Sequence, residues 1–366
     1  MQLGIWLRLQ RDIEIIIAQV LQEWKTCDAI ILTGGYGRGE GSWFLDANSV
    51  WQPYNDYDLV IVTADGISDQ NRLWHENNLA SLLQIRFIDI LQISKSELQK
   101  LPNNIKNYDL KYASKVIYGC PSILDNIPSF DASNFSLRDV ETLYFTRLFT
   151  LFGSFSSSAM TEGVDVENSR FFRNQMAKAI LAVVDALLVE TGAYHWSYTK
   201  RVHTVQKIDH LNCEPIFSLA TWALSEKLNP KARRMSGMEV KNLYSSVHTV
   251  FHKTMFRILS VYYNRPICSA NDIVAYRKFG LLNMCKRLYW FITKGNLNME
   301  RKSNEMFAEA LLVDSWENET VNVDKLQLAL KHFKRASGID LTSCTDWDLV
   351  RKAVLGYRLR DCSKFQ

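Results

Sequence analysis

The sequence has few of the residues that mark disulfide scaffolds, zinc modules or membrane proteins. Its seven cysteines are scattered and never form a C-x-x-C pair, which argues against a disulfide framework and a zinc ribbon. No hydrophobic run approaches the ~18 residues that a membrane span requires. The apolar stretch from Ile15 to Leu21 is short and follows charged residues, unlike a signal peptide. We therefore expect a cytoplasmic protein with reduced thiols and no membrane association.

A strong charge imbalance is also missing. The formal net charge is +4 over 366 residues, so the chain lacks the strongly basic surface typical of proteins that coat nucleic acids. Apolar residues make up 47% of the chain, which is ample for globular cores. The length predicts two domains or three.

The first part of the chain predicts a small mixed α/β domain. Apolar spacing indicates a helix from about Ile5 to Trp24, and the run Ala29–Leu32 is typical of a short strand. Further strands are predicted at Tyr57–Thr63 and Ile85–Ile93, with a helix between them at Gln70–Leu83.

Helical patterns dominate from about Ser136 onward, and strand-like alternation is scarce. We expect an α+β protein with two domains. The mixed α/β domain, with its N-terminal helix, would span residues 1–125. An all-α helical bundle would span residues 126–366, with a subdivision near 230–240 or 295. Its main helices are predicted at Leu137–Phe152, Ser169–Glu190, Ile216–Leu228, Gly237–Tyr262 and Asp272–Ile292.

A glycine-rich turn directly follows the first strand. Five glycines fall within the eight residues 34–41, a density that disfavours helix and strand and permits close backbone approach. Backbone N–H groups at the start of a following helix would bind phosphate oxygens. We predict that Gly34, Gly35, Arg38 and Ser42 contact a nucleotide, with the Ser42 hydroxyl as an added donor. A flexible turn without a ligand is the alternative.

Acidic residues interrupt the two following apolar strands. Asp56 and Asp58 open one strand, and side chains two residues apart point to the same side. Two such carboxylates repel each other unless a cation lies between them, and Mg²⁺ prefers carboxylate and phosphate oxygens. Asp89 interrupts the next strand and would reach the same site if the strands are neighbours. Alone, Asp89 would be an ordinary strand-end acid.

These motifs together resemble the DNA polymerase β-like nucleotidyltransferase superfamily. The matching positions are Leu32 to Gly35, the Asp56–Asp58 pair and Asp89. The string from Gly34 to Glu40 especially resembles the uridylyltransferases that modify nitrogen-regulatory proteins. The resemblance implies that the three acids are catalytic and bind two Mg²⁺ ions, with Mn²⁺ as a substitute. It covers roughly residues 25–120.

Two further features bear on this resemblance. The family places its Asp pair closer to the glycines, so the aromatic stretch from Trp43 to Tyr54 is interpreted as an insertion at the rim of the site. It would contact the base or the acceptor, or else pack on itself. The run from Gln175 to Lys178, followed by Asp185, resembles the helical half of aminoglycoside-type nucleotidyltransferases. Lys178 is therefore predicted to reach the triphosphate, with a solvated lysine as the alternative.

The sequence thus predicts a magnesium-dependent enzyme that moves a nucleoside monophosphate from an NTP to a hydroxyl and releases pyrophosphate. The preferred acceptor is a small molecule or a protein. The modest net charge makes a tRNA acceptor, as in a tRNA-modifying toxin, less favoured. A non-catalytic nucleotide-binding regulator and an antitoxin-like partner of a ribonuclease remain alternatives.

Three other sequence features are interpreted as structural rather than functional. His248 and His252 have the spacing of metal ligands but no evident third ligand. The run from Lys231 to Arg234 is expected to be a solvated helix start. Cys120 has no visible base beside it and is expected to be a buried thiol.

Overall fold

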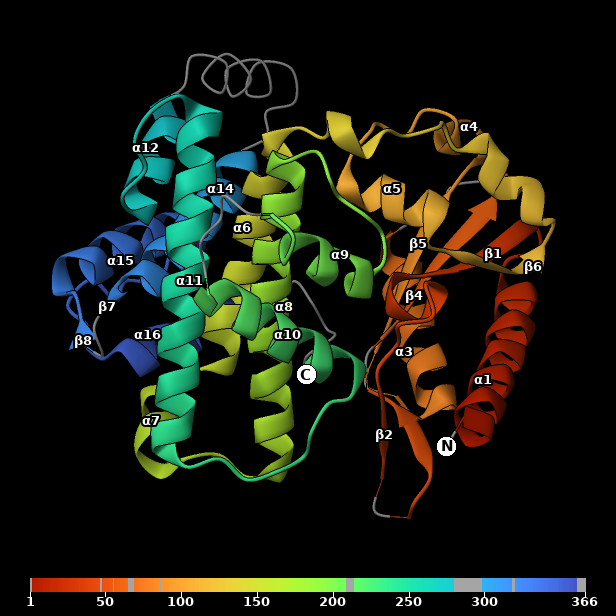
Figure 1. The fold of residues 1–366 in the computed structure, drawn as a ribbon, viewed down its shortest axis with the longest axis horizontal. Helices are drawn as coiled ribbons and strands as arrows, with labels where there is room; N and C mark the ends of the chain where they lie inside the picture. The colour runs from red at the N-terminus through yellow and green to blue at the C-terminus, as the bar shows by residue number, and fades with distance from the viewer. Residues whose placement is uncertain are drawn as a thin grey trace.

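The fold combines one small mixed sheet with many helices (Figure 1). A sheet region of residues 2–130 lies beside a helical region of residues 135–360. The computed structural model describes residues 2–46, 48–54, 56–64, 69–85, 87–208, 214–279, 298–317 and 320–360.

Four strands form the main sheet, in the order β5-β4-β1-β6. These are β1 (Cys27–Thr33), β4 (Tyr57–Thr63), β5 (Ile88–Ile93) and β6 (Lys115–Gly119). The β1 strand pairs antiparallel with β4 and β6, whereas β4 and β5 are parallel. The parallel pairing brings the amino ends of β4 and β5 to the same edge of the sheet.

Both faces of the sheet are buried, because β1 and β4 carry apolar residues on successive positions. Along β1, Ile30 and Leu32 face one core, and Ala29 and Ile31 face the other, as the alternation of side chains in a strand requires. The first face is covered by α1 (Gln2–Glu23) and α3 (Asp69–Leu83), and the second by α4 (Lys95–Leu98), α5 (Ile105–Tyr112) and the 3₁₀ turn Pro121–Asn126.

The stretch interpreted as an aromatic insertion forms a small hairpin. Its strands are β2 (Trp43–Leu45) and β3 (Trp51–Pro53), which pair antiparallel. The ring of Trp43 packs edge-on against Tyr36, with ring centroids 5.3 Å apart. This contact ties the base of the hairpin to the glycine-rich turn.

The helical region is organised around one long buried helix, α8. Its neighbours α6, α9, α10 and α11 pack against it, and most of its second half is inaccessible to solvent. The buried residues of this core begin at Phe135, whereas those under the sheet end at Ile127. The helices are α6 (Leu137–Ser154), α7 (Ser157–Glu162), α8 (Val166–Glu190), α9 (Tyr198–Val205), α10 (Glu214–Leu228), α11 (Gly237–Tyr263), α12 (Ala270–Phe279), α14 (Asn298–Asp314), α15 (Val323–Ser337) and α16 (Trp347–Arg360).

Local signals place several of these helix ends. Asp165 caps α8, and Ser236 with Glu239 forms a capping box at the start of α11. A two-stranded ribbon, β7 (Trp316–Glu317) and β8 (Thr320–Val321), links α14 to α15. No helix among the described residues is both long and apolar enough to cross a membrane.

The structure departs from the sequence expectations at several points. The strand expected from Ile85 begins at Ile88, and the hairpin and β6 were not anticipated. The helix expected over Asp272–Ile292 is seen as α12 to Phe279, and its later part lies outside the described residues. Cys120 is exposed rather than buried, since it precedes a surface 3₁₀ turn. The basic run from Lys231 is exposed as expected, but lies in the loop before α11.

Candidate functional site

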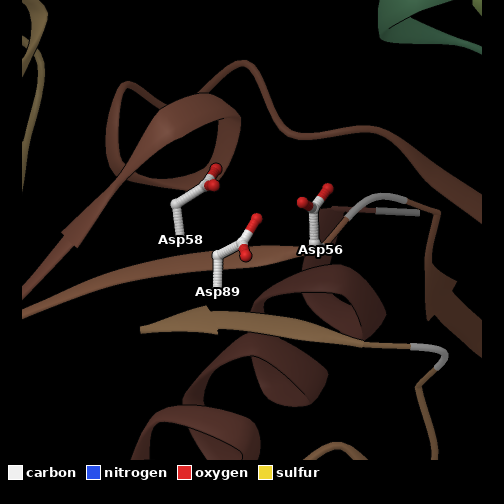
Figure 2. Close-up of side chains that lie close together, drawn as sticks. All are labelled: Asp56, Asp58 and Asp89. Carbon is white, nitrogen blue, oxygen red and sulfur yellow. The ribbon is translucent and has the colours of Figure 1, made fainter. Parts of the chain in front are cut away.

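Three carboxylates meet at one edge of the parallel strand pair. Asp56 and Asp58 lie at the start of β4 and point the same way, and Asp58 is the register partner of Asp89 on β5. One oxygen from each of the three side chains lies within 4.8 Å of the others. The carboxylates converge on one space above the strands (Figure 2). The strand pairing that the sequence left conditional is therefore present.

The glycine-rich turn packs directly on this acidic cluster. It forms a single helical turn, α2 (Gly34–Gly37), immediately after β1. Gly34 has a positive φ of 63°, and a Cβ at this position would lie 1.9 Å from the Asp58 Oδ2 atom. A side chain at position 34 would thus be both strained and in collision with a carboxylate. Only glycine lets the backbone approach Asp58 this closely, and Gly35 continues the same turn.

Burial and mutual repulsion perturb the central acid of the cluster. The pKa of Asp58 is raised to about 7, first because burial disfavours its charge and second because Asp56 carries a like charge. Lys227, Lys178 and Arg38 act in the opposite direction. A cation between the acids would therefore stabilise the charged form of the Asp58 carboxylate.

Two lysines from the helical region face the acids. Burial lowers the pKa of Lys178 on α8 to about 8, and the charge of Lys227 acts the same way, while Asp56 opposes both effects. Burial likewise lowers the pKa of Lys227 on α10 to about 8, against the opposing charge of Asp56. Arg147 on α6 adds a third positive charge near both lysines, and its Nε is buried without a hydrogen bond among the described residues. The site therefore has an acidic wall and a basic wall.

Lys227 is the residue that sequence reasoning missed. It ends the amphipathic helix α10 beside Leu228, where a lysine is usually a solvated helix end. No motif distinguishes it, and only the packing of α10 against α8 brings it to the acids. Lys178, which the sequence singled out, does lie opposite Asp56.

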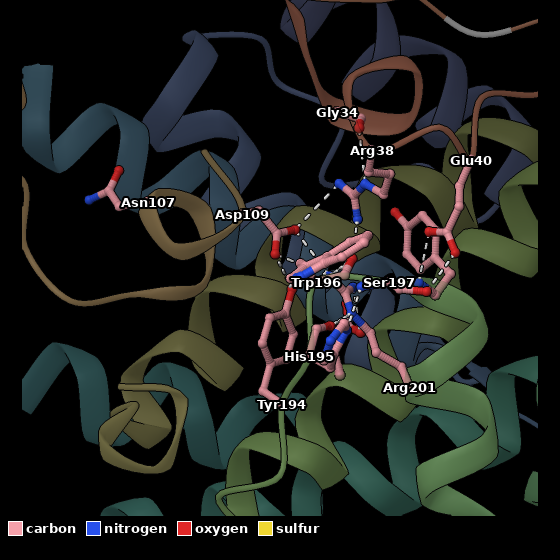
Figure 3. A network of polar contacts seen from close by, with 12 residues as sticks. Gly34, Arg38, Glu40, Asn107, Asp109, Tyr194, His195, Trp196, Ser197 and Arg201 are labelled. Carbon is pink, nitrogen blue, oxygen red and sulfur yellow. Dashed lines mark hydrogen bonds and ion pairs between the residues drawn. The ribbon is translucent and has the colours of Figure 1, made fainter. Parts of the chain in front are cut away.

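Two side chains predicted to contact a nucleotide, those of Ser42 and Arg38, bind other parts of the protein in this structure. The Ser42 side chain is fully buried, and its hydroxyl donates to the Lys227 carbonyl oxygen. Arg38 donates to the carbonyl oxygens of Gly34 and Trp196 and pairs with Asp109 (Figure 3). Both side chains are occupied in joining the sheet region to the helical region. They are not oriented as free donors for a phosphate.

The hairpin also docks on the helical region. The guanidinium of Arg170 on α8 lies 4.4 Å from the ring centroid of Phe44 and 5.9 Å from that of Tyr54. These cation–π contacts fix the aromatic stretch at the border of the two regions. The aromatic stretch packs both on itself, through the edge contact of Phe44 with Tyr54, and on the helical region.

The chemistry of the donor set fits a hard divalent cation. Carboxylate oxygens are the ligands that Mg²⁺ prefers, and the cluster has no nitrogen or sulfur donor that would favour zinc. Asp56, Asp58 and Asp89 are the group of three potential ligands found among the described residues. His248 and His252 are not part of it. His252 is buried in the helical core, and the partly buried His248 contacts the Val313 carbonyl oxygen.

Comparison with known proteins adds no assignment. No family model, curated protein or solved structure matches the chain.

Proposed function

We propose that this protein is a magnesium-dependent nucleotidyltransferase. The observation that carries the proposal is the convergence of Asp56, Asp58 and Asp89 within 4.8 Å of one another, beside a turn where Gly34 packs on Asp58. Carboxylates gathered this closely repel each other, and a cation between them would remove that repulsion. A glycine turn beside such a site leaves room for phosphate groups next to the metal ligands.

Different residues of the site would carry out different parts of the reaction. The attacking hydroxyl oxygen forms a bond to the α-phosphorus of an NTP, and the bond from that phosphorus to the pyrophosphate breaks. The three aspartates would hold Mg²⁺, which supplies charge neutralisation and orientation of the phosphates. Asp89 would also accept the proton of the hydroxyl. Lys178, Lys227 and Arg147 offset the negative charge of the leaving pyrophosphate from the opposite wall.

The acceptor is proposed to be a hydroxyl of a small molecule or a protein that enters between the two regions. A site at the border of two regions is where ligands most often bind. A tRNA acceptor is the less favoured alternative, because the net charge of +4 is modest.

The test is label transfer from each of the four NTPs, labelled at the α-phosphate, in the presence of cell extract and Mg²⁺. We expect one labelled product, stoichiometric pyrophosphate release and loss of both on chelation of the metal. Asp56→Asn and Asp58→Asn should each reduce the rate by about three orders of magnitude or more. Asp340→Asn, which changes an exposed acid of the helical region, is the matched control and should leave the rate unchanged.

Two outcomes would contradict the proposal. Full activity in either active-site variant would remove the aspartates from the chemistry. Binding of NTP with no pyrophosphate release under any acceptor would instead favour the non-catalytic regulator.

A further inference from the structure

A polar network joins the glycine turn to a segment of the helical region, residues 194–201 (Figure 3). Arg38 lies at its centre. Its Nε donates to the Gly34 carbonyl oxygen at 2.9 Å, and its Nη1 donates to the Trp196 carbonyl oxygen at 3.0 Å. Its Nη2 lies 3.3 Å from the Asp109 carboxylate. One guanidinium therefore contacts the turn, α5 and the helical region at once.

The far side of the network is anchored by a second buried arginine. Arg201 on α9 is 1% exposed, and it pairs with Asp109 at 3.0 Å and with Asp185 at 2.9 Å. It also donates to the carbonyl oxygens of His195 and Trp196. The carbonyl that receives Arg38 is thus itself held in place by Arg201.

A third connection runs from the end of the glycine-rich stretch. The Glu40 carboxylate accepts hydrogen bonds from the Ser197 hydroxyl and from the backbone N–H of Tyr198, both at 2.8 Å. The Thr199 N–H adds a longer contact at 3.2 Å. An acid of the sheet region therefore caps the N-terminus of α9, where a negative charge is favoured.

These contacts bear on the acidic cluster through Gly34. The carbonyl of Gly34 is held by Arg38, and the α-carbon of the same residue packs against the Asp58 carboxylate. A shift of the turn away from segment 194–201 would therefore move the backbone that lines the acids. Arg38 does not need to touch the substrate to affect the reaction.

We propose that Arg38 and Glu40 are positioning residues, which hold the glycine turn against Asp58 by fastening it to segment 194–201. The inference rests on the proposed nucleotidyl transfer at the same site. It gives Arg38, which the sequence predicted as a nucleotide contact, and Glu40 a role in the assembly of the site. The phosphate-binding turn is then formed correctly only while segment 194–201 is docked on it.

The geometry distinguishes an arginine from any other cation at position 38. A guanidinium donates in three directions in one plane, and the three acceptors here come from three separate segments. A lysine would keep the positive charge near Asp58 but could not hold all three acceptors. Arg38→Lys therefore distinguishes the effect of the three hydrogen-bonding contacts from the effect of the positive charge.

The experiment measures two properties of each variant well below its melting temperature. Mn²⁺ binding without nucleotide is followed by the free-ion paramagnetic resonance signal, and transfer kinetics are followed by pyrophosphate release. The variants are Arg38→Lys, Arg38→Gln and Glu40→Gln. The matched control is Arg257→Gln, which breaks an exposed bidentate pair with Glu190 on the helical region.

We expect a split between the two measurements. All variants should bind Mn²⁺ within about twofold of the wild type, because the three aspartates are unchanged. Both Arg38 variants should lose roughly 10- to 100-fold in kcat/KM for the NTP, since misplacing a contact by about 1 Å has effects of this size. Glu40→Gln should lose less, because an amide oxygen still accepts from the α9 N–H groups. Arg257→Gln should behave as the wild type.

Chemical rescue tests the positioning role directly, because a residue that only stabilised the fold would not be replaced by an added guanidinium ion. Adding millimolar guanidinium to Arg38→Ala should restore part of the lost kcat/KM, whereas methylammonium at the same concentration should not. This variant also covers the case in which the larger substitutions fold poorly.

The outcomes separate the two proposals. Wild-type kinetics in Arg38→Lys, or equal rescue by both cations, would overturn the positioning role and leave a role for charge alone. Loss of Mn²⁺ binding in the Arg38 variants would also overturn it, because the acids themselves would then depend on Arg38. If the wild type binds no Mn²⁺ and releases no pyrophosphate, the nucleotidyltransferase proposal is the one that fails.

Discussion

At the scale of single residues, the site depends on how closely Gly34 and Asp58 approach each other. Position 34 has a positive φ and lies against the Asp58 carboxylate. Any other residue would be strained at this φ and would bring a side chain into collision with the carboxylate. Gly39 has a similarly positive φ of 76°, but a Cβ there would meet no atom within 4 Å. A substitution at Gly39 would therefore cause backbone strain alone, whereas a substitution at Gly34 would cause both strain and collision.

We predict that Gly34→Ala and Gly39→Ala differ sharply in activity. Both should lose about 1–2 kcal/mol of stability from backbone strain, but only Gly34→Ala should displace Asp58 and abolish transfer and Mn²⁺ binding. Urea denaturation measures the first effect, and pyrophosphate release measures the second. Equal activities of the two variants would show that the approach to Asp58 is unimportant.

The raised pKa of Asp58 gives a prediction about stability and pH. The folded protein holds the Asp58 proton more tightly than the unfolded chain, so this group makes the protein less stable as the pH rises from about 4 to about 7. Asp58→Asn removes the charge. Without metal, the variant should exceed the wild type in stability by about 1–3 kcal/mol at pH 8, and by less at pH 5.

Denaturation in urea with a chelator at the two pH values checks this prediction. Adding Mg²⁺ at the higher pH should shrink the difference, because the cation compensates the wild-type carboxylate but finds one ligand fewer in the variant. A stability difference that is the same at both pH values would mean that ionisation of Asp58 does not destabilise the folded protein.

At the scale of elements, the basic wall depends on the packing of α10 against α8. Arg173 on α8 and Glu226 on α10 form a buried, bidentate ion pair one residue before Lys227. The guanidinium of Arg173 also lies 5.9 Å from the ring centroid of Trp222. This pair sets the register of the two helices, and with it the positions of Lys178 and Lys227.

We predict that Arg173→Met destabilises the protein by about 3–5 kcal/mol, because it leaves the Glu226 carboxylate buried without its partner. The double variant Arg173→Met/Glu226→Leu should recover most of this loss in urea denaturation. As a control, Arg257→Met breaks an exposed pair between α11 and α8 and should lose at most about 1 kcal/mol. A double variant as unstable as the single one would show that packing, rather than the unpaired charge, dominates.

The hairpin illustrates how an element's role is decided by what it contacts. Its strands are only three residues each, and a free hairpin of this size would not be stable. Contacts of Phe44 and Tyr54 with Arg170, and of Trp43 with Tyr36, supply the missing partners. The element is thus part of the border between the regions.

At the scale of the whole molecule, the border between the sheet region and the helical region is held by buried charges. Arg201 alone contacts Asp185 within the helical region and Asp109 on α5. Asp185 would lose its compensating charge if this arginine were removed, and Asp109 would keep only its pair with Arg38. The network therefore couples the stability of the two regions.

We predict that Arg201→Met lowers stability by about 3–5 kcal/mol and separates the unfolding of the two regions. Scanning calorimetry should show one cooperative transition in the wild type and two in the variant. A single transition at a lower temperature would mean that the regions remain coupled by their apolar contacts alone.

The strand and helix pattern was largely predictable, because it depends on local spacing. The apolar periodicity placed α1, α6, α8, α10 and α11 to within a few residues, and the run from Tyr57 to Thr63 matches β4. Among the strands, the sequence did not predict β6, whose residues are only partly buried, or the short hairpin. Both are stabilised by distant partners and therefore leave little local signal.

The sequence by itself determined the acidic cluster, because alternation along a strand places Asp56 and Asp58 on one side whatever the rest of the fold does. The tertiary structure alone decided that Asp89 joins them, since that requires β4 and β5 to be neighbours. It likewise decided the roles of Ser42, Arg38 and Lys227, since a polar side chain has the same local sequence whether it meets a ligand or a helix from another part of the chain.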